Sequence, residues 1–217
     1  MTRFVPNRLS AFVFLAVGSL LLAGCGDNTE VADAAGDGAE LAPLETDIVQ
    51  GSDEAPITII EYASMTCGHC AAFPEETAPA LKEKYIDTGK VKYVLREFPL
   101  DQVAAAAFVT AHCFGDGNYY AAVGLLFENI NTWAVALPDN RKDALAAQAR
   151  KAGVGRAEFD SCIDDESLYE RVKTVQESGR SLGVRSTPTF FVNGEKYAGA
   201  LSIQKIDEIL TPLLPAE

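Results

Sequence analysis

The sequence has few basic residues, few histidines and no long apolar run. It carries 18 Lys and Arg against 31 Asp and Glu, and its formal net charge is -13. Such a chain lacks the basic surface that general nucleic-acid binding or charge-driven attachment to anionic lipid requires. Its 217 residues, 48% of them hydrophobic, are enough for one folded core and exclude a chain that is disordered throughout. No internal repeat is visible.

The apolar stretch near the N-terminus is too short to cross a membrane as a helix. Ala11 to Leu22 is apolar with one polar member, whereas a spanning helix needs about 20 such residues. Two arginines precede it, and Leu22-Ala23-Gly24-Cys25 follows, a pattern that resembles the lipobox of bacterial lipoproteins. The resemblance implies that residues 1–24 are a lipoprotein signal peptide and that the Cys25 thiol carries the lipid. An ordinary signal peptide with an incidental cysteine is the alternative.

Residues 25–47 are expected to form a lipidated, acidic and flexible tether. Seven acidic side chains and no Lys or Arg lie between Gly26 and Asp47, and the interspersed Gly and Ala have little to bury. A flexible chain of this length spans about 25 Å on average. The segment therefore predicts a tether between a lipid anchor and a domain that is exported to the periplasm, where cysteines meet an oxidising environment.

From Ile48 on, the pattern becomes that of a globular α/β domain. Pro56–Tyr62 is a β-branched run typical of a buried strand, and Val91–Leu95 predicts the next strand. Between them, a helix is expected over Cys70–Tyr85, with a kink at Pro74. A strand, a helix and a strand at this spacing predict a parallel βαβ unit.

The rest of the chain divides into a helical block and a late ββα unit. Asn193-Gly194 is a strong signal for the hairpin between the two late strands, and Ser202 is expected to cap a final helix that runs to Leu210. The alanine-rich block predicts helices over Gln102–Cys113, Tyr119–Ile130, Lys142–Ala152 and Asp165–Leu182, and the late strands are Pro188–Val192 and Lys196–Ala198.

The motif Cys67-Gly68-His69-Cys70 lies between the first predicted strand and helix. At a helix N-terminus, unpaired N–H groups and the helix dipole favour negative charge, so the Cys67 thiolate is expected to be stabilised. His69 is expected to add a cationic or hydrogen-bonding neighbour to the same sulfur. Cys70 lies one turn further along the helix and suits the role of the resolving thiol, which closes a mixed disulfide formed at Cys67.

A single C-x-x-C motif also fits half of a zinc site. Zinc needs four ligands, and the sequence contains no second C-x-x-C, although a site assembled with the histidines and the distant cysteines remains conceivable. The spacing and the oxidising compartment favour the redox interpretation. We therefore expect no metal and no cofactor.

Three separated parts of the sequence together resemble a known family. They are the Cys67–Cys70 motif after a strand, the helical block, and Thr187-Pro188 before a late strand. This combination resembles the thioredoxin superfamily, and within it the DsbA-like periplasmic thiol:disulfide oxidoreductases, over about residues 48–214. The resemblance implies an α/β fold in which a thioredoxin-like domain, residues 48–99 and 183–217, is interrupted by a helical insertion, residues 100–182.

The resemblance also assigns roles to individual residues. It implies that Pro188 follows a cis peptide bond and faces the cysteine pair, and that the Thr187 backbone pairs with an extended substrate segment. Glu61 matches a family position where a buried acid helps to move the Cys70 proton. A strand-end carboxylate in solvent is the alternative for Glu61, because charged residues are rarely buried unpaired.

Cys113 and Cys162 remain once the cysteines of the motif are paired by proximity. Some relatives in the family carry a second, non-catalytic disulfide, which implies a structural Cys113–Cys162 bond. Two buried free thiols are the alternative. His112, beside Cys113, is expected to be structural.

These features predict an exported, lipid-anchored enzyme that introduces disulfides into exported proteins with cysteines by dithiol–disulfide exchange. A membrane redox partner would reoxidise or reduce the pair, and we expect a monomer without a nucleic-acid partner. The alternatives are a reductase or isomerase that uses the same cysteines, and a lipoprotein that binds metal for a maturation pathway.

Overall fold

The computed structural model describes residues 41, 43–136 and 138–215. The expected signal peptide, Cys25 and most of the expected tether lie outside these residues. Within the described part of the chain, no helix has the length and apolar character needed to cross a membrane.

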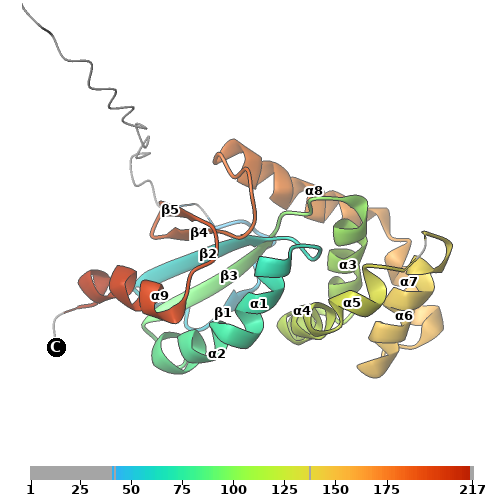
Figure 1. Ribbon diagram of the computed structural model, residues 1–217, viewed down its shortest axis with the longest axis horizontal. Coiled ribbons are helices and arrows are strands. Elements are labelled where there is room, and N and C mark those ends of the chain that lie inside the picture. The colour runs from blue at the N-terminus through green and yellow to red at the C-terminus, as the bar shows by residue number, and fades with distance from the viewer. Residues whose placement is uncertain (1–40, 42, 137, 216–217) are drawn as a thin grey trace, which may run out of the picture. The chain divides into compact units, whose positions relative to one another are not determined.

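A five-stranded mixed sheet is the centre of the described residues, with the strand order β1-β3-β2-β4-β5 (Figure 1). Strands β2 and β3 are parallel, which confirms the predicted βαβ unit, and the other neighbouring strands are antiparallel. Both central strands are buried on their two faces, as is typical of parallel strands between helices. The strands are β1 (Val49–Gln50), β2 (Ile57–Ala63), β3 (Val91–Glu97), β4 (Thr189–Val192) and β5 (Glu195–Ala198).

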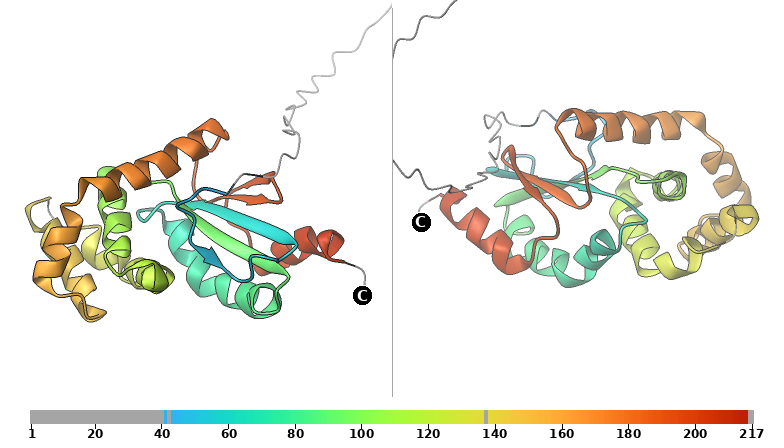
Figure 2. Two further views of the ribbon diagram at one scale, coloured as in Figure 1. Left: turned by 180° about the vertical axis from the view of Figure 1, so that it is seen from behind. Right: turned by 45° about the horizontal axis from the view of Figure 1, so that its top comes forward.

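Helices cover both faces of the sheet. Helices α1, α2 and α9 lie along one face and α8 along the other, while α3 to α7 lie beside the sheet (Figures 1 and 2). The helices of the first face are α1 (Gly68–Glu76), α2 (Ala78–Leu81) and α9 (Ile203–Leu210). Those between β3 and β4 are α3 (Gln102–His112), α4 (Tyr119–Glu128), α5 (Ile130–Trp133), α6 (Arg141–Lys151), α7 (Arg156–Ile163) and α8 (Glu166–Ser181).

The helix after β2 begins earlier and is more broken than predicted. Helix α1 begins at Gly68 because Cys67 takes the N-cap position, and it continues through Pro74 to Glu76. A second helix, α2, then starts with Pro79 in its first turn, where the missing N–H of proline has no intrahelical partner to lose. A π-helical turn follows α2.

Three short elements were not predicted from the sequence, namely β1, α5 and α7. They hold two, four and eight residues, which is too few to display a clear hydrophobic period. Helices of this length gain most of their stability from tertiary packing rather than from their own sequence.

Alternate residues of the central strands enter two separate cores. In β2, Ile59 and Ala63 pack in the larger core on the α1 side, whereas Ile60 and Tyr62 pack in the smaller core with Val175 of α8. Because side chains alternate across a strand, Glu61 lies on the α1 face, where it is 1% exposed. The β2 alternation therefore places a carboxyl group beneath the helix that carries the cysteines.

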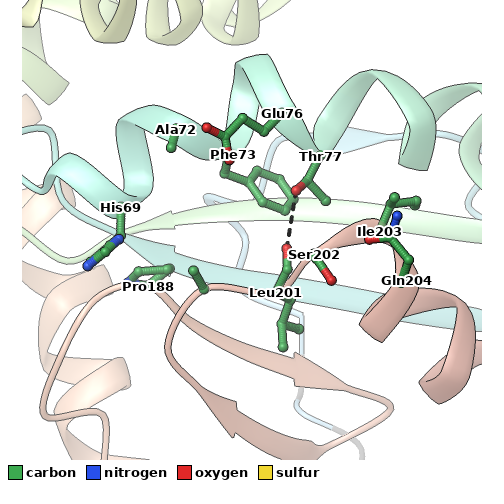
Figure 3. Close-up of a pocket in the computed structure, with 11 residues that line it drawn as sticks. His69, Ala72, Phe73, Glu76, Thr77, Pro188, Leu201, Ser202, Ile203 and Gln204 are labelled. Atoms are coloured by element: carbon green, nitrogen blue, oxygen red, sulfur yellow. Dashed lines mark hydrogen bonds between the residues drawn. The ribbon is translucent and has the colours of Figure 1, made fainter.

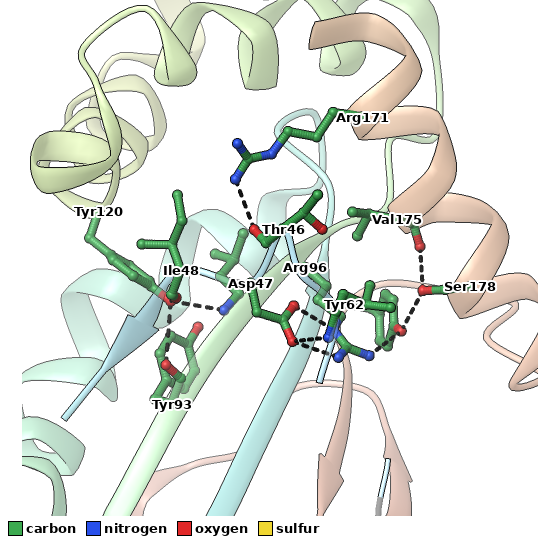
Figure 4. A network of polar contacts seen from close by, with 12 residues as sticks. Thr46, Asp47, Ile48, Tyr62, Tyr93, Arg96, Tyr120, Arg171, Val175 and Ser178 are labelled. Carbon is green, nitrogen blue, oxygen red and sulfur yellow. Dashed lines mark hydrogen bonds and ion pairs between the residues drawn. The ribbon is translucent and has the colours of Figure 1, made fainter. Parts of the chain in front are cut away.

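A buried arginine ties the start of the folded domain to the α8 face of the sheet (Figure 4). Arg96 of β3 donates through Nε and Nη2 to the two carboxylate oxygens of Asp47, at 2.9 and 2.7 Å. Its Nη1 donates to the Tyr62 hydroxyl at 3.0 Å, and that hydroxyl shares a 3.0 Å hydrogen bond with Ser178 of α8. The arginine side chain is 2% exposed, so its charge depends on these partners.

The last residues of the expected tether therefore belong to the folded domain. Leu44 packs against the core beneath α8, and Arg171 of α8 donates to the Thr46 carbonyl at 2.8 Å. The local sequence pattern predicts a tether charge at Asp47, because its partner, Arg96, lies 49 residues away in the chain.

Replacing Asp47 tests this anchor. Asp47→Ala is expected to lower the free energy of unfolding by about 3 kcal/mol, because it leaves the Arg96 charge buried without a carboxylate. The comparison variant Asp164→Ala removes an exposed ion pair with Lys142 and is expected to cost less than about 1 kcal/mol. Urea unfolding measures both changes, and equal small losses would show that the Arg96 pair does not anchor the segment.

Candidate active site

Cys67 stands where the β2–α1 loop becomes helix. It is the N-cap residue of α1, in extended backbone conformation, and its Sγ accepts the Cys70 backbone N–H at 3.3 Å. As a thiol, the same sulfur donates to the Thr187 carbonyl at 3.3 Å. Cys67 and Cys70 are both free thiols, the first partly exposed and the second buried.

Hydrogen bonds lower the pKa of the Cys67 thiol from its ordinary 9.0 to about 5. The largest cause is the hydrogen bond from the Cys70 thiol, and the side chain of Thr187 and the backbone N–H groups of Cys70 and His69 act in the same direction. Partial burial opposes the shift. At neutral pH the sulfur is therefore a thiolate, which is the nucleophilic form of cysteine.

His69 acts on the Cys67 sulfur through its backbone, whereas the sequence predicted a contact from its ring. Its backbone N–H is the group that lowers the Cys67 pKa, while its side chain is exposed and lines a groove beside Pro188 (Figure 3). A residue at the second position of a helix presents its N–H toward the N-cap whatever its side chain.

Cys70 and Glu61 are buried beneath the reactive sulfur. Cys70 is 0% exposed, and the hydrogen bond that it donates to Cys67, its burial and the Glu61 charge all raise its pKa far above the ordinary value. Burial also raises the pKa of Glu61 to about 8; a hydrogen bond from Tyr93 lowers it and the Cys67 charge raises it further. At neutral pH the site thus pairs a partly exposed thiolate with a buried thiol and a protonated acid.

Tyr93 is a site residue that no sequence motif indicated. Its hydroxyl donates to Glu61 Oε2 at 2.5 Å, and Glu61, Cys70 and Tyr93 line one cavity of about 120 Å³. Tyr93 lies in the predicted second strand, but the strand register that brings it beside Glu61 is a property of the sheet. The one sequence signal for Tyr93 is the alternation of side chains along that strand, which puts Tyr93 and Leu95 on the same face.

The segment before β4 completes the site from the other end of the chain. The Thr187–Pro188 peptide bond is cis, Pro188 is buried, and the Thr187 carbonyl reaches the Cys67 sulfur. The structure thus brings together six of the residues selected from the sequence: Glu61, Cys67, His69, Cys70, Thr187 and Pro188.

The other selected cysteines lie in the helical block. Cys113, at the end of α3, and Cys162, in α7, form a disulfide with their Cα atoms 5.7 Å apart. Neighbouring His112 is buried, with its Nε2 2.9 Å from Glu97 Oε1. Among the described residues, no group of three or more His, Cys, Asp or Glu side chains is placed to hold a metal ion.

A thiolate at a helix start, next to a buried second thiol, is suited to thiol–disulfide exchange, because attack at the first sulfur can be completed by the second. The parallel βαβ unit followed by an antiparallel hairpin and a last helix is the thioredoxin arrangement. Fold and site together define a thiol:disulfide oxidoreductase of the thioredoxin superfamily.

Comparison with known proteins agrees with this class. A family model described as thioredoxin matches residues 44–211. The crystal structure of Wolbachia pipientis alpha-DsbA1 is 31% identical with a TM-score of 0.72, and the match covers 80% of this chain and 93% of that one. Chlamydia trachomatis DsbA shares the fold at 20% identity, with a TM-score of 0.67 over 79% of this chain and 93% of its own.

A Rickettsia bellii protein whose name describes a protein-disulfide oxidoreductase is 34% identical over 159 residues. The match covers 69% of this chain and 58% of that protein, so the chain spans little more than half the length of this curated relative. The chain belongs to the thioredoxin family, and within it to the DsbA-like thiol:disulfide oxidoreductases.

Alkylation of the reduced protein tests the two thiols separately. Iodoacetamide is expected to modify Cys67 with a pH midpoint near its pKa of about 5, and to leave Cys70 unmodified at neutral pH because it is buried and protonated. Peptide mass spectrometry at a series of pH values measures both. Modification of Cys70 before Cys67 would reverse the assignment.

Proposed function

We propose that this protein is an exported, lipid-anchored thiol:disulfide oxidase that introduces disulfides into exported proteins. The observation that carries the proposal is the position of Cys67 at the N-cap of α1, where its sulfur accepts the Cys70 N–H at 3.3 Å and its pKa is lowered to about 5. Interactions that stabilise the Cys67 thiolate stabilise the reduced protein, so its disulfide form is a strong oxidant. The relatives named as disulfide oxidoreductases support the same chemistry.

The reaction begins with the oxidised protein, in which Cys67 and Cys70 share a disulfide. A substrate thiolate attacks the Cys67 sulfur, a mixed disulfide forms, and the Cys67–Cys70 bond breaks. The leaving Cys70 sulfur takes the proton of Glu61, which is protonated at neutral pH because its pKa is about 8. This transfer keeps charge from accumulating on the buried sulfur.

A second substrate thiolate then attacks the substrate sulfur of the mixed disulfide. The substrate gains a disulfide, and Cys67 leaves as a thiolate, held by the hydrogen bonds at the start of α1. Two electrons pass from the substrate dithiol to the cysteine pair. A membrane redox partner must remove these electrons to restore the disulfide.

The substrate segment is proposed to lie along a groove of about 410 Å³ beside the reactive sulfur. Figure 3 shows His69 and Pro188 at one end of this groove and Ile203 and Gln204 at the other. Phe73 and Leu201 supply apolar walls between these ends. An extended substrate that pairs with the Thr187 backbone would place its cysteine at Cys67 and a neighbouring side chain in the groove.

The proposal for the anchor rests on the sequence. Residues 1–24 act as a lipoprotein signal peptide, Cys25 carries the lipid, and the acidic segment after it spaces a monomeric domain from the periplasmic membrane surface. A position near the membrane would keep the protein close to exported chains and to its redox partner.

The redox equilibrium with glutathione tests the oxidase proposal. We expect a potential above about -200 mV, in the oxidising half of the range of this superfamily. His69→Pro removes the backbone N–H that stabilises the thiolate, so the potential should fall by about 30 mV, which corresponds to ~1.4 kcal/mol. His69→Ala keeps that N–H and should change the potential much less.

Equal shifts in the proline and alanine variants would assign the effect to the imidazole instead. A potential near that of thioredoxin, about -270 mV, with strong insulin reduction and no oxidation of a reduced test protein, would favour the reductase or isomerase alternative.

Fractionation of cells tests the anchor. The native protein is expected with the membranes, and Cys25→Ala is expected to release the protein or leave its precursor unprocessed, because the lipid bond needs the thiol. Mass spectrometry of the mature N-terminus measures the modification directly. An unmodified Cys25 in mature native protein would contradict the proposal.

A further inference from the structure

Glu61 has a buried hydrogen-bond partner in Tyr93, on the neighbouring strand. Glu61 is 1% exposed and Tyr93 is 5% exposed, and the Tyr93 hydroxyl donates to Oε2 of the carboxyl group. In the parallel register of the two strands, Tyr93 lies opposite Ile59, one alternate position before Glu61. The phenol therefore reaches diagonally across the α1 face of the sheet to the acid.

The cavity that these side chains line has both buried and partly exposed residues in its wall. Glu61, Cys70 and Tyr93 are buried members of its lining, while Gln50 and Gly124 are partly exposed members. Its volume of about 120 Å³ is sufficient for a few water molecules, since each occupies about 30 Å³ in the liquid. Polar groups in the lining supply the hydrogen bonds that such waters need.

The titratable groups that face Glu61 come from three elements. Tyr93 lies on β3, Cys67 and Cys70 lie at the start of α1, and Tyr120 of α4 lines the same cavity. Burial and nearby acid groups hold the pKa values of both phenols well above the ordinary tyrosine value. Tyr93 therefore remains a neutral donor throughout the pH range in which Glu61 titrates.

We propose that Tyr93 is a positioning residue for proton exchange at Cys70: its hydroxyl holds the Glu61 carboxyl group in the cavity, and this cavity carries the proton between Glu61 and solvent. The inference rests on the proposed function, because it assumes that Cys70 closes or opens a disulfide with Cys67.

Closure of the pair in the reverse direction isolates the proton step. The Cys67 thiolate of reduced protein attacks oxidised glutathione, which gives a Cys67–glutathione mixed disulfide and one glutathione thiolate. Cys70 then gives its proton to the Glu61 carboxylate and attacks the Cys67 sulfur, and the second glutathione leaves as a thiolate. Glu61 finally releases the proton through the cavity, and two electrons have passed to glutathione.

The test is a single-turnover reaction of reduced protein with excess oxidised glutathione, quenched with acid between pH 5.5 and 9.5. Mass spectrometry separates the mixed disulfide from the closed Cys67–Cys70 form, so the two steps have separate rates. In the native protein, closure should accelerate as Glu61 ionises. Tyr93→Phe removes a hydrogen bond that favours the carboxylate and should move the closure midpoint up by about one pH unit.

At pH 7 this shift makes closure about tenfold slower, whereas formation of the mixed disulfide should change less than twofold because Cys67 is already a thiolate. Tyr85→Phe is the matched control, since Tyr85 also donates to a carboxylate, that of Asp207 at 2.7 Å, away from the cysteines. It should leave both profiles unchanged. An unchanged closure profile in Tyr93→Phe would overturn the inference.

Gly124 tests the cavity without altering Glu61 or Tyr93. Gly124 lines the cavity, and a Cβ atom there would clash with no neighbour, so larger side chains are tolerated at this position and are expected to narrow the cavity, Gly124→Leu more than Gly124→Ala. Closure should slow in the order native, alanine, leucine, with no shift of the pH midpoint. Equal closure rates in all three would overturn the cavity route, whereas absence of any mixed disulfide in the native protein would overturn the proposed function itself.

Discussion

The negative charge on the Cys67 sulfur is stabilised by groups from two distant parts of the chain. Helix α1 supplies the backbone N–H groups of His69 and Cys70 and the Cys70 thiol, and the segment before β4 supplies Thr187. The second part reaches the sulfur because β4 pairs antiparallel with β2, with Thr189 opposite Tyr62 near the end of β2. The central sheet therefore assembles the environment of the thiolate.

The same sheet also positions the two groups of the site that stay protonated at neutral pH, Glu61 and Cys70. Strand alternation places Glu61 on the α1 face, where burial raises its pKa, and Cys70 is buried beside it with a raised pKa of its own. The partly exposed Cys67 sulfur is a thiolate that can attack or leave, while the buried Cys70 sulfur and the acid hold protons at neutral pH. This division lets one pair of cysteines act in sequence, since each step needs one charged and one protonated partner.

Two sets of contacts outside the active site connect the helices and strands around it. The Cys113–Cys162 disulfide joins the end of α3 to α7 within the helical block, and the Arg96 network connects the segment around Asp47 with β2 and α8. Thr46 and Asp47 are therefore held on the α8 side of the sheet, whereas the cysteines occupy the start of α1 on the other side.

The features that depend on neighbouring residues could be predicted from the sequence. The β-branched runs around Ile59 and Tyr93 identified the two parallel strands, Asn193-Gly194 identified the hairpin, and the position of Cys67 before a helix indicated a stabilised thiolate. These features depend on residues that are close in sequence, through period, turn chemistry and helix-end N–H groups.

What the tertiary structure decided is which distant residues meet. The hydrogen bond of Tyr93 to Glu61 joins residues 32 positions apart, and the Asp47–Arg96 pair joins residues 49 positions apart. The part of His69 that reaches the sulfur is its backbone rather than its ring, because the first turn of α1 orients N–H groups toward Cys67 while the side chain lies exposed at one end of the groove. Strand register and helix packing set these contacts, and spacing along the sequence carries no record of either.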